Sequence, residues 1–392
     1  MSGARPICFV NARMAAGIGS LRVRAGLIEG IDVSAARGDR VVDLEGDRLL
    51  PGLINAHDHL QFSNFMRTRF RDRHENVAEW IADVTVERSR DERLIEARRL
   101  PLAARLFAGG VKNLLSGATT VAHHDGFHES LAAADFPVRV LRSCGWAHSP
   151  ALTPEHELRT SLRDTPTDWP WIVHAGEGVD VAAAAEFSRL EALGCIGART
   201  LLVHALGFEP EQFERLMLAG AGVIWCPSSN IYLFGRTLDP LPLAARGRLG
   251  LGSDSRISGA WDLLAELRVA REAVPAVGPW LEDLVTRWNA RLLRLGDRGV
   301  LAPGMLADLV VLPAGLSMVD AHRADLRLVL VGGDVRYGDR EYATALGVVE
   351  ACLPVQLDGR EKILDRRVVR RLRNSRWIEP GLEIPPAEER AA

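Results

Sequence analysis

The sequence predicts an α/β fold, a distorted (β/α)8 barrel of the TIM type with a small β-sandwich domain built from both ends of the chain. The first observation behind this prediction is that the middle of the chain alternates short apolar strands with helical patterns, as in a parallel sheet. The second is that several of these strands end in His or Asp, and such barrels place their active sites at the carboxyl ends of the strands.

The barrel is expected to occupy residues 51–301. After a first strand that ends at His57, its strands are predicted at residues 119–123, 138–141, 172–174, 201–204, 223–226 and 249–252. Helical patterns cover residues 92–115, 181–193, 210–219 and 261–273. Only seven strands are clear, because the stretch from 140 to 174 has room for little more than one helix at ~1.5 Å per residue. The fourth strand is therefore expected to be abbreviated, around 149–152 or 169–171, or the barrel to be distorted.

Strand patterns at both ends of the chain predict the small β domain. They cover residues 7–10, 21–24 and 40–44 near the start, and a matching set returns at 307–312 and 327–331. The small domain is expected to contain residues 1–50 and 302–345, followed by a C-terminal extension at 346–392. The charged, Pro-rich end of that extension is expected to be a solvated helix and loose tail, with subunit contact as the alternative.

Composition is that of an ordinary globular protein of 392 residues, with 47% hydrophobic and 25% charged residues. The net charge of −3 gives no argument for nucleic-acid or membrane binding, and no apolar run approaches the ~18 residues of a membrane helix. The five cysteines are scattered and no secretory signal is evident, so a cytoplasmic protein with reduced thiols is expected. The expected partner is a small-molecule substrate, and a homodimer is left open.

Histidines and one aspartate stand where predicted strands end. His57 and His59 lie two residues apart, so on a strand both side chains point to the same side. Further apolar strands end in His174, His204 and Asp254. Imidazole and carboxylate are the usual ligands of a hydrolytic metal, and catalytic zinc takes about three protein ligands plus water. The pattern predicts a metal site, against the alternative of scattered polar residues.

The order His-x-His, His, His, Asp resembles the amidohydrolase superfamily in its aminohydrolase branch, which includes cytosine and guanine deaminases and chlorohydrolases. The similarity covers most of the chain. It begins near Pro51-Gly52, continues through the segments at 117–121 and 226–230, and ends at 304–311. The motifs are specific to the superfamily and much less specific to a substrate.

The resemblance implies a metal site made of His57, His59, His174 and Asp254, holding one divalent ion, with zinc favoured over iron(II). Asp254 would also act as general base. Glu177, three residues after His174, would be the general acid that protonates a ring nitrogen and then the leaving amine. His204 would hydrogen-bond the attacking water or the oxyanion, or become a ligand if a second ion is present.

A second metal in such enzymes is often bridged by a carboxylated lysine on a middle strand. The only lysines are Lys112, in a helical stretch before the second strand, and Lys362, near the chain end. Neither is expected to serve as a bridge. The sequence therefore favours one metal, although a two-metal site bridged by other residues stays open.

Substrate contacts are suggested at several positions, each with a structural alternative. Ser228, Asn230, Arg236 and Trp80 are the candidates, against turn capping, surface exposure and core packing. Weaker suggestions are an aromatic wall that includes Phe62 and Phe65, an anion-reading Arg256, and His124 facing the pocket.

The predicted function is metal-dependent hydrolytic deamination, releasing ammonia from an amino-substituted N-heterocycle or a related amidine. One alternative is a hydrolase on the same scaffold that opens a cyclic amide or displaces halide or alkylamine. Glu177 favours the deaminase, because an amide carbonyl does not need protonation of a ring nitrogen. A catalytically silent binding module is the other alternative.

Overall fold

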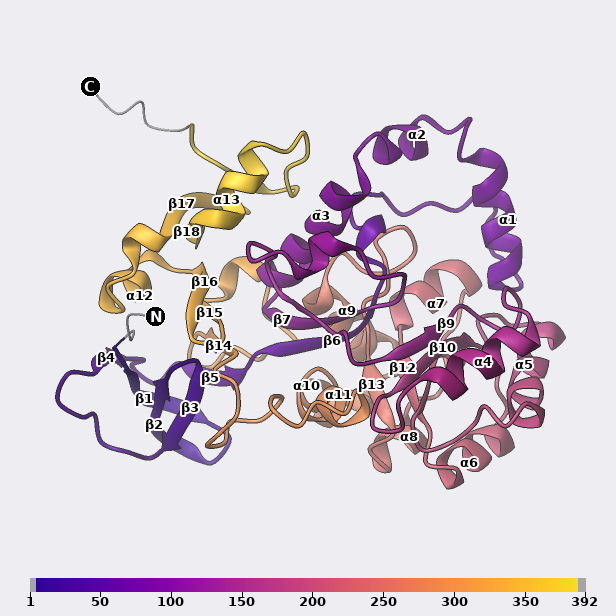
Figure 1. Ribbon diagram of the computed structural model, residues 1–392, viewed down its shortest axis with the longest axis horizontal. Coiled ribbons are helices and arrows are strands. Elements are labelled where there is room, and N and C mark those ends of the chain that lie inside the picture. Colours follow the sequence, from indigo (N-terminus) through magenta and orange to yellow (C-terminus); the bar gives the residue numbers. More distant parts are fainter. Residues whose placement is uncertain (1–4, 387–392) are drawn as a thin grey trace.

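The computed structural model describes residues 5–386 and contains two regions (Figure 1). Strands from the start and the end of the chain lie together on one side of the view, and the middle of the chain forms an α/β region on the other side. The α/β architecture with parallel sheets agrees with the prediction. No helix in the described part of the chain is long and apolar enough to cross a membrane.

The α/β region contains two parallel sheets. The three-stranded sheet consists of β6 (Leu53–Asp58), β7 (Ala118–His123) and β8 (Arg139–Val140). The five-stranded sheet consists of β9 (Gly145–Ala147), β10 (Trp171–Ala175), β11 (Thr200–His204), β12 (Gly222–Trp225) and β13 (Leu249–Leu251). All residues of β6, β7 and β10 to β13 are buried, which explains why they appear in the sequence as continuous apolar runs.

The fourth strand differs from the prediction. It is β9, which lies before residues 149–152 and pairs with the start of β10, so that Gly145 stands opposite Trp171. Trp171 itself belongs to the next strand, β10. Only residues 141–144 separate β8 from β9, and a parallel pair needs a connection of about a dozen residues or more. This short connection explains why the parallel ladder is interrupted between these two strands.

Helices alternate with the parallel strands, and aspartates begin three of them. Asp91, Asp180 and Asp262 accept hydrogen bonds from backbone N–H groups in the first turns of α2, α5 and α9. The helices are α1 (Val77–Glu87), α2 (Glu92–Arg98), α3 (Leu102–Leu115), α4 (Glu155–Asp164), α5 (Val181–Ala192), α6 (Pro210–Leu218), α7 (Pro227–Phe234), α8 (Leu241–Ala245), α9 (Leu263–Ala273), α10 (Leu281–Leu284) and α11 (Arg287–Leu292).

One predicted helix, at residues 92–115, is divided into α2 and α3. The break falls at Pro101, which stands at the N-cap of α3. Proline has no backbone N–H and clashes with the preceding turn, so it ends a helix or begins one.

Strands from both ends of the chain form one eleven-stranded sheet. From the start come β1 (Ile7–Met14), β2 (Gly17–Arg24), β3 (Leu27–Ile31), β4 (Arg40–Asp43) and β5 (Arg48–Pro51); from the end come β14 (Leu309–Leu312), β15 (Leu328–Val331), β16 (Asp334–Gly338), β17 (Cys352–Leu357), β18 (Arg360–Asp365) and β19 (Leu382–Glu383). The two groups join where β5 pairs with β14. This sheet is the feature that the matching strand patterns predicted, while its arrangement as a sandwich stays a prediction.

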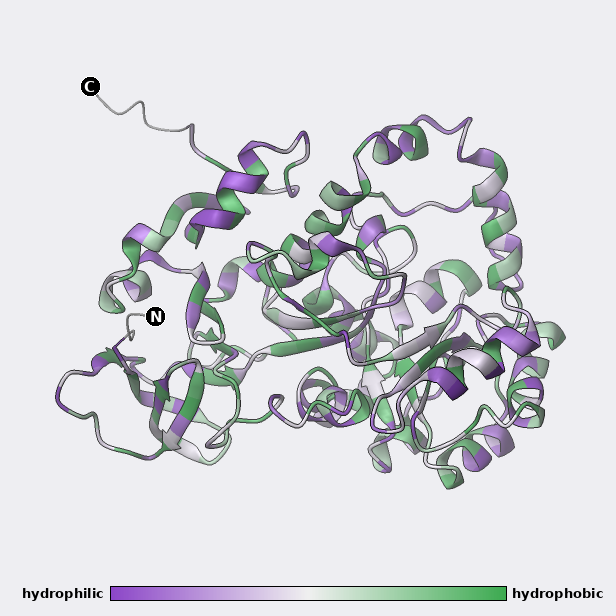
Figure 2. Ribbon diagram, in the orientation of Figure 1, coloured by the Kyte–Doolittle hydropathy of each residue, from purple (hydrophilic) through white to green (hydrophobic). Residues whose placement is uncertain are grey.

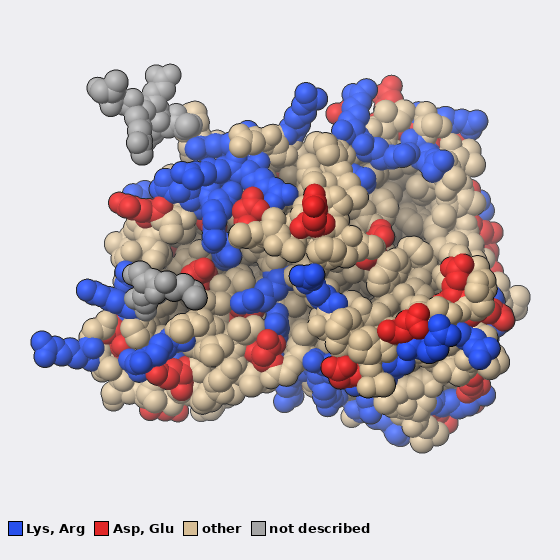
Figure 3. All heavy atoms as spheres, in the orientation of Figure 1, with Lys and Arg blue, Asp and Glu red and all other residues tan. Residues whose placement is uncertain are grey.

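The C-terminal extension is more ordered than expected. After α12 (Arg340–Ala345), strands β17 to β19 extend the same sheet, and α13 (Arg366–Arg373) packs beside them. Helix α13 alternates polar and apolar residues (Figure 2), and it buries Val368, Val369 and Leu372. Its basic side chains gather on the surface (Figure 3). The extension is therefore a packed part of the molecule at least as far as Glu383.

Candidate active site

Three imidazoles and one carboxylate converge where β6, β10 and β13 end. The Nε2 atom of His174 lies 3.2 Å from Nε2 of His57 and 3.3 Å from Nε2 of His59. Asp254 Oδ1 lies 3.8 Å and 3.9 Å from the same atoms of His57 and His59. Ligand atoms about 2.1 Å from a zinc ion are about 3.4 Å apart in a tetrahedron, so this donor set fits a divalent metal.

Local backbone geometry brings these side chains together. Gly252 lets the end of β13 approach β6, because a Cβ atom there would lie 2.6 Å from the Cβ atom of His57. Just beyond it, the backbone N–H of Asp254 donates to the carbonyl of His57 at 3.1 Å. Asp254 and His204 both have positive φ angles, 52° and 73°, which are uncommon for non-glycine residues. Such strain concentrates at functional sites.

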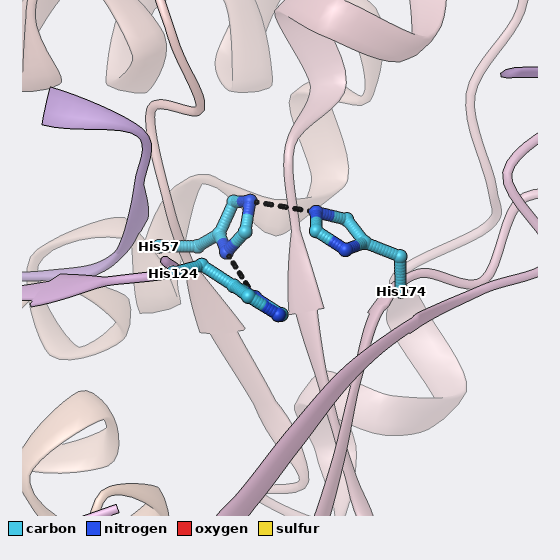
Figure 4. A group of neighbouring side chains, drawn as sticks. All are labelled: His57, His124 and His174. Carbon is cyan, nitrogen blue, oxygen red and sulfur yellow. Dashed lines mark hydrogen bonds between the residues drawn. The ribbon is translucent and has the colours of Figure 1, made fainter. Parts of the chain in front are cut away.

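Hydrogen bonds fix which nitrogen of each histidine is free to bind a metal. The Nδ1–H of His174 donates to the carbonyl of His148 at 2.8 Å, which leaves Nε2 of His174 with its lone pair. His124 donates from Nε2 to the carbonyl of Ala147 at 2.8 Å, so its Nδ1 can accept from Nδ1–H of His57 at 3.3 Å. Nε2 of His57 is therefore also free, and it points at His174 (Figure 4).

Burial keeps these imidazoles in the neutral form that metal binding needs. It lowers the pKa values of His57, His124 and His174 well below the ordinary histidine value, and the neighbouring histidines add to the effect. His124 is within ligand distance of His57 and His174, but its Nδ1 accepts the proton of His57. We therefore assign His124 to positioning His57. The consecutive histidines at the end of β7 were the sequence signal for it.

Replacing His124 with alanine is expected to weaken zinc binding by about 10- to 100-fold, because His57 loses the partner that sets its tautomer and ring orientation. Competition with a chromogenic chelator measures this affinity. His156→Ala, at an exposed position on α4, is the matched control. An unchanged zinc affinity in His124→Ala would show that His124 does not contribute to the metal site.

Glu177 and His204 form a second pair beside the converging ligands. Nε2 of His204 lies 3.4 Å from Oε1 of Glu177, and Nδ1–H of His204 donates to Oδ1 of Asn230 at 2.9 Å. Burial raises the pKa of Glu177 well above its ordinary value, and the carboxylates of Asp254 and Glu186 raise it further. The raised pKa favours the neutral acid form of Glu177, which can donate a proton, and Nε2 of His204 can accept a hydrogen bond from it.

The glycines on both sides of Glu177, Gly176 and Gly178, are closely packed. A Cβ atom would lie 2.6 Å from the Phe208 ring at Gly176 and 2.6 Å from the Glu75 carbonyl oxygen at Gly178. These close contacts fix the backbone on both sides of Glu177.

Asp254 presents its carboxylate to both the histidines and the cavity. Oδ1 accepts from the backbone N–H of Ser255 at 2.7 Å, and Oδ2 accepts from the hydroxyl of Ser258 at 2.9 Å. Burial alone would raise the pKa of Asp254, but the imidazoles of His59 and His204 hold that pKa below its ordinary value. The carboxylate is therefore ionised, as a ligand or a general base must be.

A cavity of about 330 Å³ opens onto these groups. His59, His174, Glu177, His204 and Asp254 all line it. Its apolar wall consists of Phe62, Val77, Trp80, Ile81, Val84, Leu152 and Ile257. The indole N–H of Trp80 donates to the carbonyl of Thr68 at 3.0 Å, which fixes the ring against the cavity. The size is that of a small-molecule site.

The other suggested substrate contacts lie outside the cavity wall. Asn230 supports His204, as described above, and the Ser228 backbone N–H donates to buried Glu266 on α9 at 2.9 Å. Arg236 is exposed beyond the end of α7. Phe65 packs against Phe62, which does line the cavity. Ser228 and Asn230 belong to α7, a short helix that the sequence analysis missed.

Lys112 lies beside the site and pairs with a carboxylate. Its Nζ atom is 2.8 Å from Oδ2 of Asp58 and donates to the carbonyl of Asp254 at 3.4 Å. Both side chains are almost fully buried. Lys112 therefore acts as a buried cation that connects the segments carrying the His-x-His pair and Asp254.

Substituting Lys112 with methionine is expected to destabilise the fold by about 3–5 kcal/mol, because Asp58 becomes a buried charge without its cation. Urea unfolding followed by circular dichroism measures the loss. The double variant Lys112→Met/Asp58→Asn is expected to recover part of it. A loss below about 1 kcal/mol, the level of a surface pair, would contradict the assignment.

Comparisons with known proteins identify relatives. No family model matches the sequence. The chain is 36% identical to 8-oxoguanine deaminase from Pseudomonas aeruginosa over 172 residues, which cover 38% of each chain. It is 24% identical to 5-methylthioadenosine/S-adenosylhomocysteine deaminase from Nitratidesulfovibrio vulgaris, over 77% of this chain and 82% of that one. Most of the curated relatives are matched over no more than about half of their length.

A solved structure shows the same fold. A variant of atrazine chlorohydrolase from Arthrobacter aurescens, complexed with zinc and atraton, superposes with a TM-score of 0.70 at 17% identity, covering 88% of this chain and 100% of that chain. Together with the curated relatives, this confirms the resemblance found in the sequence. The chain is thus similar to deaminases of the amidohydrolase superfamily, in its aminohydrolase branch.

Proposed function

We propose that this protein is a metal-dependent hydrolytic deaminase that releases ammonia from an amino-substituted N-heterocycle or a related amidine. The observation that carries the proposal is the placement of Glu177. Its buried side chain lines the same cavity as His59, His174 and Asp254. The related deaminases named above act on purine-type compounds, which supports the same chemistry here.

The metal would be held by His57, His59, His174 and Asp254, with zinc favoured and iron(II) as the alternative. Bound there, a divalent ion supplies Lewis acidity and lowers the pKa of water towards about 7. A zinc-containing structural relative supports this choice. Lys112 is engaged by Asp58, which supports a site for a single ion.

The carboxyl groups of Asp254 and Glu177 then carry out different proton transfers. Asp254 is ionised and lines the cavity, so its carboxylate accepts the proton of the attacking water. The raised pKa of Glu177 favours its acid form, which donates its proton to the ring nitrogen next to the carbon under attack. Glu177 then takes up the hydroxyl proton of the tetrahedral adduct and passes it to the leaving amine, and the proton held by Asp254 restores the acid form of Glu177. His204, fixed by Asn230, presents the lone pair of Nε2 on the side of Glu177, so it can accept a hydrogen bond from the attacking water and orient it.

The lining of the cavity favours a particular charge on the substrate. Among the described residues that line it, Asp125, Glu177 and Asp254 carry carboxyl groups, and none is Lys or Arg. The side-chain amide of Gln61 donates to Oδ2 of Asp125 at 2.5 Å, and both residues line the cavity. A cavity without cationic side chains suits an uncharged or cationic heterocycle better than an anion. The flat wall that includes Trp80 suits a planar ring.

The main alternative is hydrolysis of a cyclic amide, a halide or an alkylamine on the same scaffold. It does not need a group that protonates a ring nitrogen, whereas Glu177 stands ready for that step. A silent binding module would be expected to lack part of the ligand set, whereas His57, His59, His174 and Asp254 are all present in this chain.

A substrate panel tests the proposal directly. Zinc-reconstituted protein is incubated with amino-purines, amino-pyrimidines and amino-triazines, and with matched chloro and cyclic-amide compounds, and ammonia is measured. Ammonia release from amino compounds alone is the expected result. Turnover confined to chloro or cyclic-amide compounds would replace the proposal with its alternative.

Several wider predictions belong to this proposal. We infer that the parallel strands act as one distorted (β/α)8 barrel over residues 51–301, beside a β-sandwich formed by 1–50 and 302–345 with an extension at 346–392. A cytoplasmic location and a homodimer also stay predictions. Sedimentation of the purified chain tests the dimer.

A further inference from the structure

The segment that follows Asp254 forms one wall of the catalytic cavity. Ser255, Ile257 and Ser258 line the cavity, and the hydroxyl of Ser258 donates to Oδ2 of Asp254. Arg256 lies between these residues in the chain, yet it does not line the cavity, and its side chain is only 4% exposed. The hydrogen bonds and the ion pair of the buried Arg256 side chain therefore help to fix the conformation of this wall.

The side chain of Arg256 binds one carbonyl group within this wall and another in the segment after His59. Its Nε–H donates to the carbonyl of Trp261 at 2.7 Å, and the guanidinium lies 4.0 Å from the centre of the Trp261 ring. Its Nη1 group donates to the carbonyl of Ser63 at 3.1 Å. One side chain thus connects the loop after Asp254 with the loop after His59.

The carboxylate that neutralises Arg256 comes from the C-terminal extension. Glu379 accepts hydrogen bonds from Nη1 and Nη2 of Arg256 at 3.0 and 2.5 Å. It also accepts one from Arg323 at 2.6 Å, and its own side chain is fully buried. Arg323 has a further partner in Asp358 at 2.7 Å, whereas Glu379 is the acidic partner of Arg256 among the described residues.

We propose that Glu379 is a positioning residue for the active site: through Arg256, the C-terminal extension holds the cavity wall at 255–261 and the carboxylate of Asp254 in place. The role of Asp254 in this statement rests on the function proposed above. The link between Glu379 and the wall rests on the contacts alone.

The physical reason is the cost of burying a guanidinium without a counter-charge. Without Glu379, Arg323 keeps Asp358, but Arg256 keeps only carbonyl oxygens and the Trp261 ring. The guanidinium of Arg256 is then better solvated if the side chain turns toward water. This movement breaks its hydrogen bonds to the carbonyls of Trp261 and Ser63. The opposite side of the wall would keep two anchors, the Thr68 N–H to the Ile257 carbonyl at 2.9 Å and the Arg67 Nε–H to the Gly259 carbonyl at 2.6 Å.

The test compares Glu379→Gln with Asp358→Asn in the full-length, zinc-loaded protein. Asp358→Asn removes a charge from the same network without touching Arg256, so it is the matched control. Glu379→Asp retains the buried charge and serves if Glu379→Gln does not fold. The readouts are amide hydrogen exchange of peptides covering 255–261 and 62–65, zinc affinity by chelator competition, and global stability by urea unfolding.

Glu379→Gln is expected to speed exchange of the 255–261 peptides by about tenfold or more and to weaken zinc binding by about 10-fold. The control is expected to leave both near the wild-type values. Glu379→Asp is expected to give smaller changes in the same direction. Equal exchange in wild type and Glu379 variants, or the same change in Asp358→Asn, would overturn the proposal. If the protein binds zinc but deaminates nothing, the proposed function fails, while hydrogen exchange still decides the role of Glu379.

Discussion

Replacing Asp254 with asparagine is expected to lower kcat/KM by about 10²–10⁴-fold or more, because the base of the proposed mechanism can then no longer accept the proton of the attacking water. The change is nearly isosteric. The carbonyl oxygen of the amide can still accept from the Ser255 N–H, so the loop is expected to stay folded. Ammonia release under single-substrate conditions gives the rate, and circular dichroism checks the fold.

The control for this variant is Asp164→Asn, an exposed aspartate at the end of α4. It is expected to behave as wild type. Asp254→Asn is also expected to bind zinc more weakly, since a carboxylate ligand is lost, so the rate is measured at saturating zinc. A variant that keeps more than about a tenth of the wild-type rate would show that another group is the base.

Glu177→Gln is expected to slow deamination by about 10²–10⁴-fold while zinc stays bound. Glutamine preserves the shape of the buried side chain but cannot donate a proton to a ring nitrogen. The KM is expected to change little, because the loss is confined to the transition state. Glu191→Gln, on the exposed face of α5, is the matched control.

The pH profile gives this prediction a second readout. Burial raises the pKa of Glu177 and so extends its acid form to higher pH, and the rate should fall as pH rises through that raised pKa. The descending limb is expected to be absent from the residual activity of Glu177→Gln. An unchanged limb would assign the titration to another group.

The converging site could be predicted because its signals are local. The apolar runs that end in His57 and His174 are buried strands, and the carboxyl ends of parallel strands meet at one edge of a sheet. Once these runs are predicted as strands of one parallel sheet, their terminal histidines are expected to lie close together. The same reasoning extends to Asp254, although the positive φ angle that aims its carboxylate could not be foreseen.

Other parts depended on tertiary contacts that leave no local pattern. Strand β9 has only three residues, Gly145 to Ala147, which is too short to show a period. Helix α7 follows its strand directly and was interpreted as a turn. The pairing of Arg256 with Glu379 joins residues 123 positions apart. No local pattern reveals such a pair, and the charged end of the chain therefore predicts a solvated tail.

The proposed metal site is tested most directly by the metal content per chain, measured by plasma mass spectrometry on wild type and on His57→Ala/His174→Ala. Both are purified without chelator, reconstituted with zinc and desalted. The predicted result is about one tightly held ion per wild-type chain and almost none in the variant. Wild-type protein that retains no metal, or a variant that retains as much as wild type, would contradict the assignment of these histidines as a metal site.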